Sequence, residues 1–481
     1  MPVYTELPLM SPQHVYESIA SPNSFLLESI KGPEKIARYS FVGAGPFLTI
    51  KIKNGSCNIC RDGKEVLISR SPMKVIKDIL TAYKAVKLKG LPPFTGGAVG
   101  LISYDFVHYF ERLPRTATDD LKIPDAHFMF VDTVIAVDRK LEKTFIMSCP
   151  GASEIVTGKS DRTNDRGASY DDACEKIVSL YGKIKRASTG PSARSYISMP
   201  QGIKRVPVQI KHEMGKRAYM DIVQRAKEYI RAGDIFQANL SQRVSAHIGD
   251  ISPWHIYSVL SSINPSPFAG YLDMGDYSIV SSSPERLVRV VGDKVETRPI
   301  AGTRPRGTDA EGDRQMRADL LLNEKERAEH IMLIDLERND LGKIADYSTV
   351  GVDELMITED YSHVIHIVSN IRGEVAGGKD CFDVIRATFP GGTITGVPKV
   401  RCMEIIDELE PVTRGPYTGS IGYISFNGDM DLNIIIRTFV IKNKTAYVQV
   451  GAGIVADSDP EREYYETLKK AEALIKTLEV L

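Results

Sequence analysis

The chain has 481 residues and an almost balanced charge, with 61 Lys and Arg against 62 Asp and Glu and a net charge of −1. Hydrophobic residues make up 42% and charged residues 26%, as in an ordinary globular protein with a large core. The basic segments Lys183–Arg186 and Lys204–Lys211 are short and lack interleaved aromatic side chains, so we expect no nucleic-acid partner. Because the sequence has no run of about 18 apolar residues and no signal-peptide pattern at its N-terminus, we expect no membrane association and a cytoplasmic location.

Residues 1–148 are predicted to form a β-rich N-terminal domain of the regulatory type. Helices are expected over 12–20 and from Ser71 to about Val86. Strand-like runs lie at Phe25–Ile30, Ala37–Val42, Pro46–Lys53, Gly96–Phe106, Phe128–Val137 and Lys143–Met147. Residues 149–213 change in composition toward Ser, Gly, Arg and Lys, which predicts a linker or surface insertion with one helical stretch at Tyr170–Lys185.

Residues 214–481 are predicted to form a second, catalytic domain. Its first helix, Gly215–Ala232, has apolar residues at every fourth position, and further helices are expected at Gly312–Asp335, Asp383–Ala387, Lys399–Glu408 and Glu461–Leu478. Strands are expected at Ile235–Ala246, Ala269–Leu272, Ser278–Ser281, Leu287–Val291, Lys294–Thr297, Ile421–Phe426, Asp431–Val440 and Thr445–Ile454. Strands that follow one another without β-α-β alternation favour an α+β fold with large antiparallel sheets and helices outside.

Two pairs of glutamates have the spacing that places both side chains on one helix face. Glu326 and Glu329 precede an apolar run that indicates a buried helix, and Glu463 and Glu466 repeat the spacing near the C-terminus. Buried like charges repel each other unless a cation lies between them. Since carboxylate oxygens suit hard ions, we expect the two pairs to converge on one Mg²⁺. Spacing alone leaves open the alternative that both pairs lie on solvated helix faces.

Glycine-dense turns form a second feature, and they lie at Phe389–Lys399, Gly415–Gly422 and Gly451–Gly453. None has phosphate-loop spacing, but together with Arg437 they make a pocket for a carboxylate plausible; the alternative is simple tight turns. His366 lies in an apolar run, where it is either a satisfied core residue or a proton donor or acceptor. These residues together indicate an enzyme with a Mg²⁺-like site and a small carboxylate substrate, without defining a reaction.

These same segments resemble the chorismate-utilising enzymes. The resemblance covers VETRPIAGTRPRG (295–307), NEKERAEHIMLIDLERNDLG (323–342), YSHVIHIVSNIRG (361–373), FPGGTITGVPKVRCMEIIDELEP (389–411), GPYTGSIGY (415–423), IIIRT (434–438) and GAGIVADSDPEREYYET (451–467). LLES (26–29) and ARYSFVG (37–43) extend it into the N-terminal half. It implies a sandwich of antiparallel sheets with helices outside.

The resemblance also implies roles for individual residues. Glu329 and Glu466 would bind Mg²⁺, with Glu326 and Glu463 beside them, and the ion would hold the ring carboxylate of chorismate. His366 would lie near the departing C4 hydroxyl as a catalytic group. The implied substrate-contacting residues are Gly302, Thr303 (also a catalytic group), Tyr417, Arg437, Gly451, Ala452 and Gly453.

Two positions bear on which reaction of the family takes place. Gln237, a further catalytic candidate, stands where water-adding members have a Lys base, and Ala301 stands where many aminodeoxychorismate synthases have a Lys nucleophile. This favours direct attack of ammonia on C2, as in the anthranilate synthases of tryptophan biosynthesis. The alternatives are an aminodeoxychorismate synthase of the 4-aminobenzoate branch, which QANLSQR and NPSPF resemble, and a chorismate-binding protein without turnover.

Two further features concern partners. Ser29 in LLES matches the family's tryptophan-feedback pocket, together with Pro267, Phe268 and Ala269 of NPSPFAG, where a Phe replaces the usual Tyr-Met. The sequence has no GxCxG glutaminase motif. We therefore expect ammonia to come from a separate glutamine amidotransferase subunit or from free ammonium, and L-tryptophan to be a possible inhibitor.

Overall fold

The computed structural model describes residues 1–158, 166–189, 208–361 and 364–481. Parts of the predicted linker or insertion at 149–213 lie outside the described residues, as do residues 204–207 of the second basic segment and residues 362–363 of the YSHVIHIVSNIRG motif. Within 149–213 the chain forms helices α3 and α4, and α4 contains the helix predicted at Tyr170–Lys185.

The helices lie mostly between runs of strands. They are α1 Pro12–Ile19, α2 Pro72–Ala82, α3 Ala152–Val156, α4 Arg166–Thr189, α5 Lys216–Arg231, α6 Pro253–Ile263, α7 Ala310–Leu322, α8 Glu324–Gly342, α9 Cys381–Thr388, α10 Lys399–Leu409 and α11 Pro460–Glu479, with 3-10 turns η1 Tyr104–Tyr109 and η3 Gly392–Ile394.

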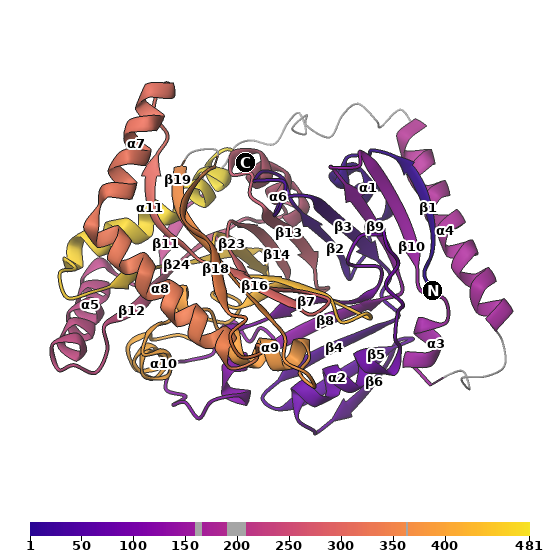
Figure 1. Ribbon diagram of the computed structural model, residues 1–481, viewed down its shortest axis with the longest axis horizontal. Helices are drawn as coiled ribbons and strands as arrows, with labels where there is room; N and C mark the ends of the chain where they lie inside the picture. The colour runs from indigo at the N-terminus through magenta and orange to yellow at the C-terminus, as the bar shows by residue number, and fades with distance from the viewer. Residues whose placement is uncertain (159–165, 190–207, 362–363) are drawn as a thin grey trace.

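Two large sheets form the centre of the molecule (Figure 1). The first has the strand order β1 Val3–Pro8, β10 Lys143–Ser148, β9 Thr133–Asp138, β3 Tyr39–Ala44, β2 Ser24–Glu28, β13 Phe268–Asp273, β14 Ser278–Ser283, β23 Thr438–Lys442, β24 Thr445–Ile454, β12 Gln237–His247 and β11 Ile210–His212, with β20 Gly396–Val397 paired to β12. Its neighbouring strands run antiparallel.

The second sheet is also antiparallel. Its order is β17 Ile300–Pro305, β19 Val364–Glu374, β16 Lys294–Arg298, β15 Arg286–Val291, β22 Met430–Asn433, β21 Ser420–Ser425, β7 Gly97–Ile102, β8 Ala126–Val131, β4 Leu48–Lys53, β5 Ser56–Arg61 and β6 Lys64–Ile68, with β18 Gly351–Asp360 paired to β19. The predicted α+β fold with antiparallel sheets is confirmed.

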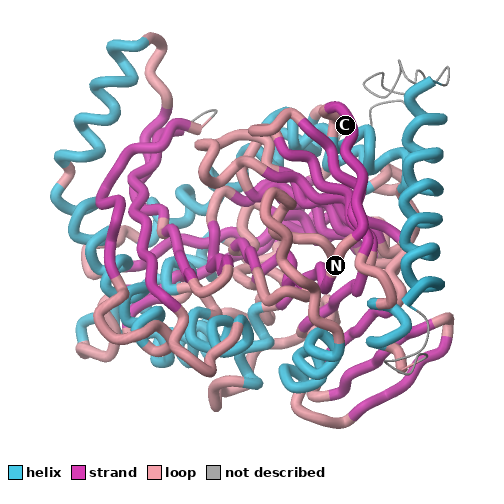
Figure 2. Tube along the Cα trace, turned by 45° about the vertical axis from the view of Figure 1, so that its right-hand side comes forward, coloured by secondary structure: helices cyan, strands magenta, loops and turns pink. Residues whose placement is uncertain are grey.

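Central strands such as β7, β8 and β14 are buried on both faces and contain no Lys, Arg, Asp or Glu, whereas the edge strands β1 and β6 are partly exposed. On β7, Val99 and Leu101 join a core cluster shared by strands of the two sheets, whereas Ala98 and Ile102 join a second cluster that includes α2 and α10. A third cluster joins the first sheet to α1, α4, α6 and α11. The helices therefore lie outside a sheet-on-sheet sandwich, and Figure 2 shows them on both sides of the strands.

Three predicted elements are each divided in the structure, and one of them is the strand expected at Phe128–Val137, which is β8 in the second sheet and β9 in the first. The helix expected at Gly312–Asp335 is two helices, α7 and α8, because Asn323 has extended backbone angles (φ −70°, ψ 111°) and its side chain caps α8. The strand expected at Asp431–Val440 is β22 and β23, separated by residues 434–437, where Arg437 has a φ of +51°. All three predictions of continuous elements were wrong at these points.

Each sheet contains strands from residues 1–148 and from residues 214–481. The two parts of the chain are joined by the pair β2–β13 in the first sheet and by the pair β7–β21 in the second. The division into 1–148, 149–213 and 214–481 stays a prediction. Across the part of the chain that the structure describes, none of the helices has the length and apolar character needed to cross a membrane.

Candidate active site

His366 and Thr303 lie opposite each other on β19 and β17. Thr303 Oγ1 is 2.9 Å from His366 Nδ1, and the same nitrogen is 3.2 Å from the carbonyl oxygen of Gly302. Gly302 has a φ of +64°, and a Cβ there would come within 2.8 Å of Glu326 Oε2. The glycine is therefore required both by its backbone angle and by the carboxylate of α8 that packs against it.

Burial controls the protonation of His366. Its imidazole is 2% exposed, and burial, followed by the nearby Arg437 guanidinium, lowers its pKa to about 3. Tyr361 lies edge-on to the imidazole with 5.2 Å between ring centroids. The imidazole is therefore neutral near pH 7.

Arg437 supplies a positive charge with few fixed partners. Burial lowers its pKa, while the nearby Tyr361 and Glu285 act in the opposite direction. Arg437 has a left-handed backbone conformation and directly precedes β23, in the short connection between β22 and β23. A guanidinium in such surroundings suits a carboxylate ligand, which it can bind through two hydrogen bonds.

Gly451–Gly453 is part of strand β24, so the prediction of a turn at these residues was wrong, and the pairing of β24 with β12 brings them beside Gln237. Asn239 pairs with Gly453, and Ser241 pairs with Gly451. A Cβ on Gly453 would lie 2.3 Å from Gln237 Nε2, and a Cβ on Gly451 would lie 2.7 Å from the Tyr417 hydroxyl. These glycines therefore let polar side chains reach the β24 backbone, and Ala452 between them is fully buried.

The first carboxylate pair lies at the start of α8, next to these strands. Gln237 Nε2 donates to Glu329 Oε1 at 3.3 Å, and Arg304 Nη1 donates to Glu326 Oε1 at 3.1 Å. Burial, followed by the charge of Glu326, raises the pKa of Glu329. The helix is buried along one face only: Leu333 and Ile334 are buried, but Ile331 is 48% exposed. The prediction of a buried helix therefore holds for one face of α8 and is wrong for the face that carries Ile331.

The second pair lies at the start of α11. Burial raises the pKa of Glu463, and Glu466 beside it adds to this rise. Lys470 Nζ is 2.9 Å from Glu466 Oε1 and donates to the Gly451 carbonyl at 3.1 Å. The positive charges of Lys325 and Lys470 act to lower the pKa values of both Glu329 and Glu463. The N-terminal turns of α8 and α11 are therefore close enough to be influenced by the same two lysines. Within the described residues, no three His, Cys, Asp or Glu side chains lie close enough together to form a ready metal cluster.

Several buried polar atoms around these residues have no hydrogen-bond partner within the described chain. They include Gln237 Oε1, Asn239 Oδ1, His366 Nε2 and Glu285 Oε1. Buried polar atoms are almost always satisfied in folded proteins, so a group of unsatisfied atoms at one place needs an explanation. Acceptor atoms beside a positive Arg437 are what a polar, anionic ligand with hydroxyl groups would use.

Three residues near the site were not predicted. Asn239 follows Gln237 by two positions and therefore lies on the same strand face, a signal that the strand period could have given. Glu285 and Glu337 are buried acids whose pKa values are raised by burial to about 7 and about 8. Glu285 is a lone acid in the sequence, without a second acid at helical spacing. Glu337 has Asp340 three residues further along α8, but nothing in that spacing indicates that its carboxyl group is buried.

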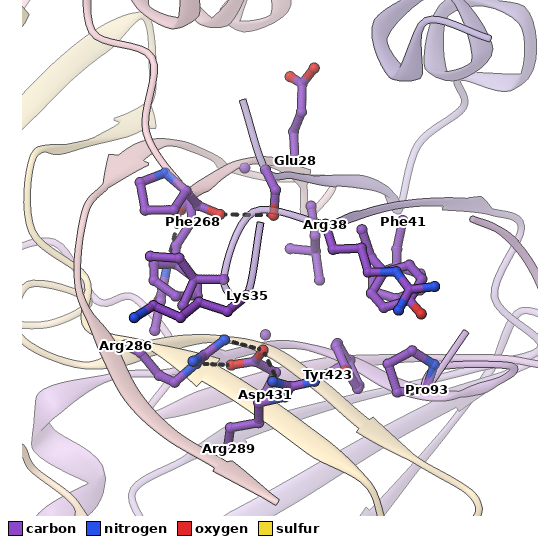
Figure 3. Close-up of a pocket in the computed structure, with 18 of the residues that line it drawn as sticks. Glu28, Lys35, Arg38, Phe41, Pro93, Phe268, Arg286, Arg289, Tyr423 and Asp431 are labelled. Atoms are coloured by element: carbon purple, nitrogen blue, oxygen red, sulfur yellow. Dashed lines mark hydrogen bonds and ion pairs between the residues drawn. The ribbon is translucent and has the colours of Figure 1, made fainter. Parts of the chain in front are cut away.

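A separate cavity of about 750 Å³ lies away from this site (Figure 3). Its lining includes all four residues predicted for the feedback pocket: Ser29, Pro267, Phe268 and Ala269. Ser29 Oγ donates to the Pro267 carbonyl at 2.9 Å and so joins the two segments directly. Residues more than 230 positions apart are brought together here because β2 pairs with β13.

The cavity wall combines aromatic rings with charges. Figure 3 shows Arg286 and Arg289 beside Asp431 on one side, with Phe41 and Tyr423 nearby. Arg286 Nε donates to Asp431 Oδ1 at 2.9 Å. The Glu28 carboxylate points away from the cavity, because it accepts hydrogen bonds from the Tyr257 hydroxyl at 2.6 Å and Gln13 Nε2 at 3.2 Å. Lys35 and Arg38 leave the wall rich in positive charge.

Comparison with known proteins defines the class of this fold and site. A family model described as chorismate binding enzyme matches residues 22–476. Because the match covers nearly the whole chain, the protein belongs to the chorismate-binding enzyme family, as the sequence motifs predicted.

Within this family, the chain is similar to the synthase components of two enzymes. The chain is 45% identical over 456 residues to anthranilate synthase component 1 of Acetivibrio thermocellus, covering 95% of this chain and 90% of the relative. It is 41% identical over 456 residues to aminodeoxychorismate synthase component 1 of Bacillus subtilis, covering 95% and 91%. The crystal structure of anthranilate synthase component I from Streptococcus pneumoniae TIGR4 superposes with a TM-score of 0.77 at 34% identity, covering 97% of each chain.

Proposed function

We propose that this chain is the synthase subunit of an anthranilate synthase, which converts chorismate and ammonia to anthranilate and pyruvate. The observation that carries the proposal is the environment of Gln237. Its Nε2 is held by Glu329, and its Oε1 is buried without a partner in the described chain. An amide cannot act as the base of a water-adding enzyme, but an amide oxygen at this place can accept a hydrogen bond from ammonia and orient its lone pair.

The four predicted metal ligands fit Mg²⁺ in their chemistry. All are carboxylates, and three of them (Glu326, Glu329 and Glu463) are half-buried, where like charges gain most from a cation. Glu329 and Glu466 would hold the ion, with Glu326 and Glu463 beside them. A bound Mg²⁺ would neutralise the ring carboxylate of the substrate.

The remaining residues would bind and orient the substrate. Arg437 and the Tyr417 hydroxyl would hold the enolpyruvyl carboxylate against the Gly451–Gly453 segment of β24, whose glycines leave room for it. Thr303 and Gly302 would fix the ring of His366 near the C4 hydroxyl, which leaves as water. Loss of the enolpyruvyl group as pyruvate then makes the ring aromatic.

The aminodeoxychorismate synthase reaction is the second candidate, because a relative with that name is nearly as similar. Ala301 lies on β17, next to Gly302, and its methyl group cannot form a covalent intermediate. Purified protein supplied with chorismate, Mg²⁺ and ammonium should produce the fluorescence of anthranilate. If 4-aminobenzoate forms instead once a lyase is added, the second candidate is correct; if neither product forms, the chain binds chorismate without turnover.

The metal proposal has its own test. Glu329→Gln keeps the size of the side chain and removes one negative charge, so we expect kcat with saturating Mg²⁺ to fall by at least about a hundredfold. Calorimetric titration with Mg²⁺ alone should show weaker binding than to the unaltered protein. Glu324→Gln, an exposed acid on the same helix, is the control. An unchanged rate and unchanged Mg²⁺ binding in Glu329→Gln would refute the metal site.

We also propose that ammonia reaches the site from a separate glutamine amidotransferase subunit, because the sequence has no glutaminase motif of its own. The expected kinetic signature is activity with ammonium but none with glutamine for the isolated chain. Glutamine-dependent activity of the isolated chain would contradict this.

The cavity around Ser29 is the proposed site of feedback inhibition by L-tryptophan. Its Phe268, Phe41 and Tyr423 can contact an indole ring, and its positive charges can bind a carboxylate. L-Tryptophan should inhibit the ammonium-dependent reaction, and Ser29→Phe, which fills the cavity, should abolish the inhibition. A flat response of the unaltered protein to tryptophan would mean that the cavity serves no such role.

A further inference from the structure

Arg414 is a buried guanidinium whose five N–H groups all have acceptors. Its side chain is 1% exposed. Nε donates to Glu410 Oε2 at 3.0 Å, and Nη2 donates to Glu410 Oε1 at 2.7 Å and to the Asn239 carbonyl at 2.6 Å. Nη1 donates to the Ile394 carbonyl at 2.9 Å and to Thr418 Oγ1 at 3.3 Å. Because the N–H donors of a guanidinium point in fixed directions in one plane, they can hold several backbone segments at fixed distances from one another. The ammonium group of a lysine cannot do this.

Two aromatic rings add to this arrangement. The Arg414 Cζ lies 4.9 Å from the ring centroid of Tyr104 and 5.6 Å from that of Tyr417. Both contacts are within the range of cation–π attraction, which is stronger away from water. Arg414 therefore contacts the aromatic ring of Tyr417, while the Tyr417 hydroxyl lies next to Gly451 of the candidate site.

Glu410 extends the network to the central strands. Its Oε1 accepts from the backbone N–H and from the hydroxyl of Ser241, each at 2.8 Å. Gln449 Nε2 in turn donates to Ser241 Oγ at 2.8 Å. The ion pair therefore joins the end of α10, strands β12 and β24, and the loop that carries Tyr417, and every one of these segments contributes to the candidate site or adjoins it.

We propose that Arg414 is a positioning residue for the enzyme. Through its hydrogen bonds and the Tyr417 ring, it sets the distance between Tyr417 and the Asn239–Gly451 region, and so sets the affinity for the substrate group bound there. The kinetic form of this inference rests on the proposed function, but the affinity for chorismate tests it independently.

Arg243 provides a matched comparison. It lies on β12, the strand of Asn239 and Ser241, and its side chain is 5% exposed. It is paired with Asp120, and its Cζ lies 5.5 Å from the Tyr447 ring centroid. Within the described residues, however, the Arg243 side chain donates hydrogen bonds only to Asp120 and to no residue of the candidate site. An effect that comes only from the lost packing of a buried arginine should therefore be equally large when Arg414 and when Arg243 is replaced.

The experiment compares Arg414→Lys with Arg243→Lys in the full chain. For Arg414→Lys we expect the KM for chorismate and the calorimetric dissociation constant of chorismate to rise about tenfold, with the KM for ammonium unchanged. For Arg243→Lys we expect a lower thermal midpoint without a change in either chorismate constant. Tyr104→Leu, which removes one ring from Arg414 but none of its hydrogen bonds, should raise both chorismate constants about threefold.

The outcomes separate the two proposals. If the unaltered protein binds chorismate but forms no anthranilate, the proposed function fails, and the calorimetric comparison still decides the role of Arg414. If Arg414→Lys keeps both chorismate constants and loses only kcat in step with its folded fraction, Arg414 is a structural residue and the inference is overturned. If Arg414→Lys does not fold, an unchanged chorismate affinity in folded Tyr104→Leu overturns it as well.

Discussion

His366 faces the site with a lone pair. Its Nδ1 lies 2.9 Å from Thr303 Oγ1, which can donate or accept, and 3.2 Å from the Gly302 carbonyl, which can only accept. We therefore assign the hydrogen to Nδ1, which leaves Nε2, without a partner among the described residues, as the acceptor. With a pKa lowered to about 3 by burial, the ring stays in this neutral form near pH 7. In the resting site His366 therefore accepts a hydrogen bond from a substrate hydroxyl, and it can donate a proton only after gaining one.

Glu337 is in the opposite state, a carboxyl group that keeps its proton. Thr297 Oγ1 lies 2.7 Å from both the Leu287 carbonyl and Glu337 Oε2. Thr297 Oγ1 can donate its one hydrogen to either acceptor, and a protonated Glu337 that donates to Thr297 Oγ1 would satisfy both contacts. Burial, followed by the charges of Glu285 and Asp340, raises the pKa of Glu337 to about 8, which favours this protonated form.

This gives a prediction for stability against pH. Below the ordinary carboxyl pKa of 4.5, Glu337 is protonated in both the folded and unfolded states and costs nothing. As pH rises from there toward about 8, the unfolded state releases the proton more readily, so the folded state loses stability. The loss is on the order of 4 kcal/mol, because each pKa unit corresponds to about 1.4 kcal/mol.

Glu337→Gln removes this titration and keeps a donor for Thr297. We expect its thermal midpoint to exceed that of the unaltered protein at pH 8, and the two midpoints to converge near pH 5. Other titrating groups are common to both proteins and cancel in the difference. A difference that is the same at both pH values would mean that Glu337 is not protonated in the folded state.

Among the elements, helix α8 presents two of the proposed Mg²⁺ ligands, Glu326 and Glu329, in its first turns. Asn323 Oδ1 accepts from the Glu326 backbone N–H at 3.0 Å, so one cap fixes the turn that presents the first carboxylate pair. Asn323→Ala should cost about 1 kcal/mol of stability. Because the frayed turn would hold Glu326 and Glu329 less firmly, Mg²⁺ binding measured by calorimetry should weaken several-fold.

Asn323→Ser restores a capping oxygen and serves as the control for that variant. If Asn323→Ala loses stability but binds Mg²⁺ as before, packing of Leu333 and Ile334 holds the helix start instead of the cap.

The elements also indicate what a sequence can predict. Helix α5 was predicted within a residue or two, because its apolar residues repeat at every fourth position without a break. Strand β18 was missed, since its register shifts between Val352 and Glu354 and again between Glu354 and Ile357, and Met356 has a φ of +51°, so no period of two survives. Spacing predicted the glutamate pairs, but only the pairing of β12 with β24 places Gly453 against Gln237.

At the scale of the whole molecule, one segment connects the cavity with the candidate site. Asn433 lines the cavity and donates to the Phe268 carbonyl at 3.3 Å, and the Ile434 N–H donates to the Glu285 carbonyl at 3.0 Å. Arg437 follows three residues after Ile434. A ligand in the cavity that displaces β22 therefore acts on a backbone that continues directly into the site.

Because both sheets contain strands of residues 1–148 and of residues 214–481, we expect the two parts to fold as one unit. If residues 214–481 were produced alone, β13 would lose β2 and β21 would lose β7, and two buried strand edges would become exposed. The core cluster that joins Phe25 and Phe41 to Leu272, Ile421 and Tyr423 would also be opened.

We therefore expect the fragment 214–481 to aggregate when produced alone. Co-expressed with a fragment of residues 1–189, it should co-purify as a complex that binds chorismate. Size-exclusion chromatography and chorismate calorimetry on both preparations measure this, with the unbroken chain as the control. A monomeric 214–481 fragment that binds chorismate as tightly as the full chain would mean that the catalytic part folds independently, and that the shared sheets serve regulation more than stability.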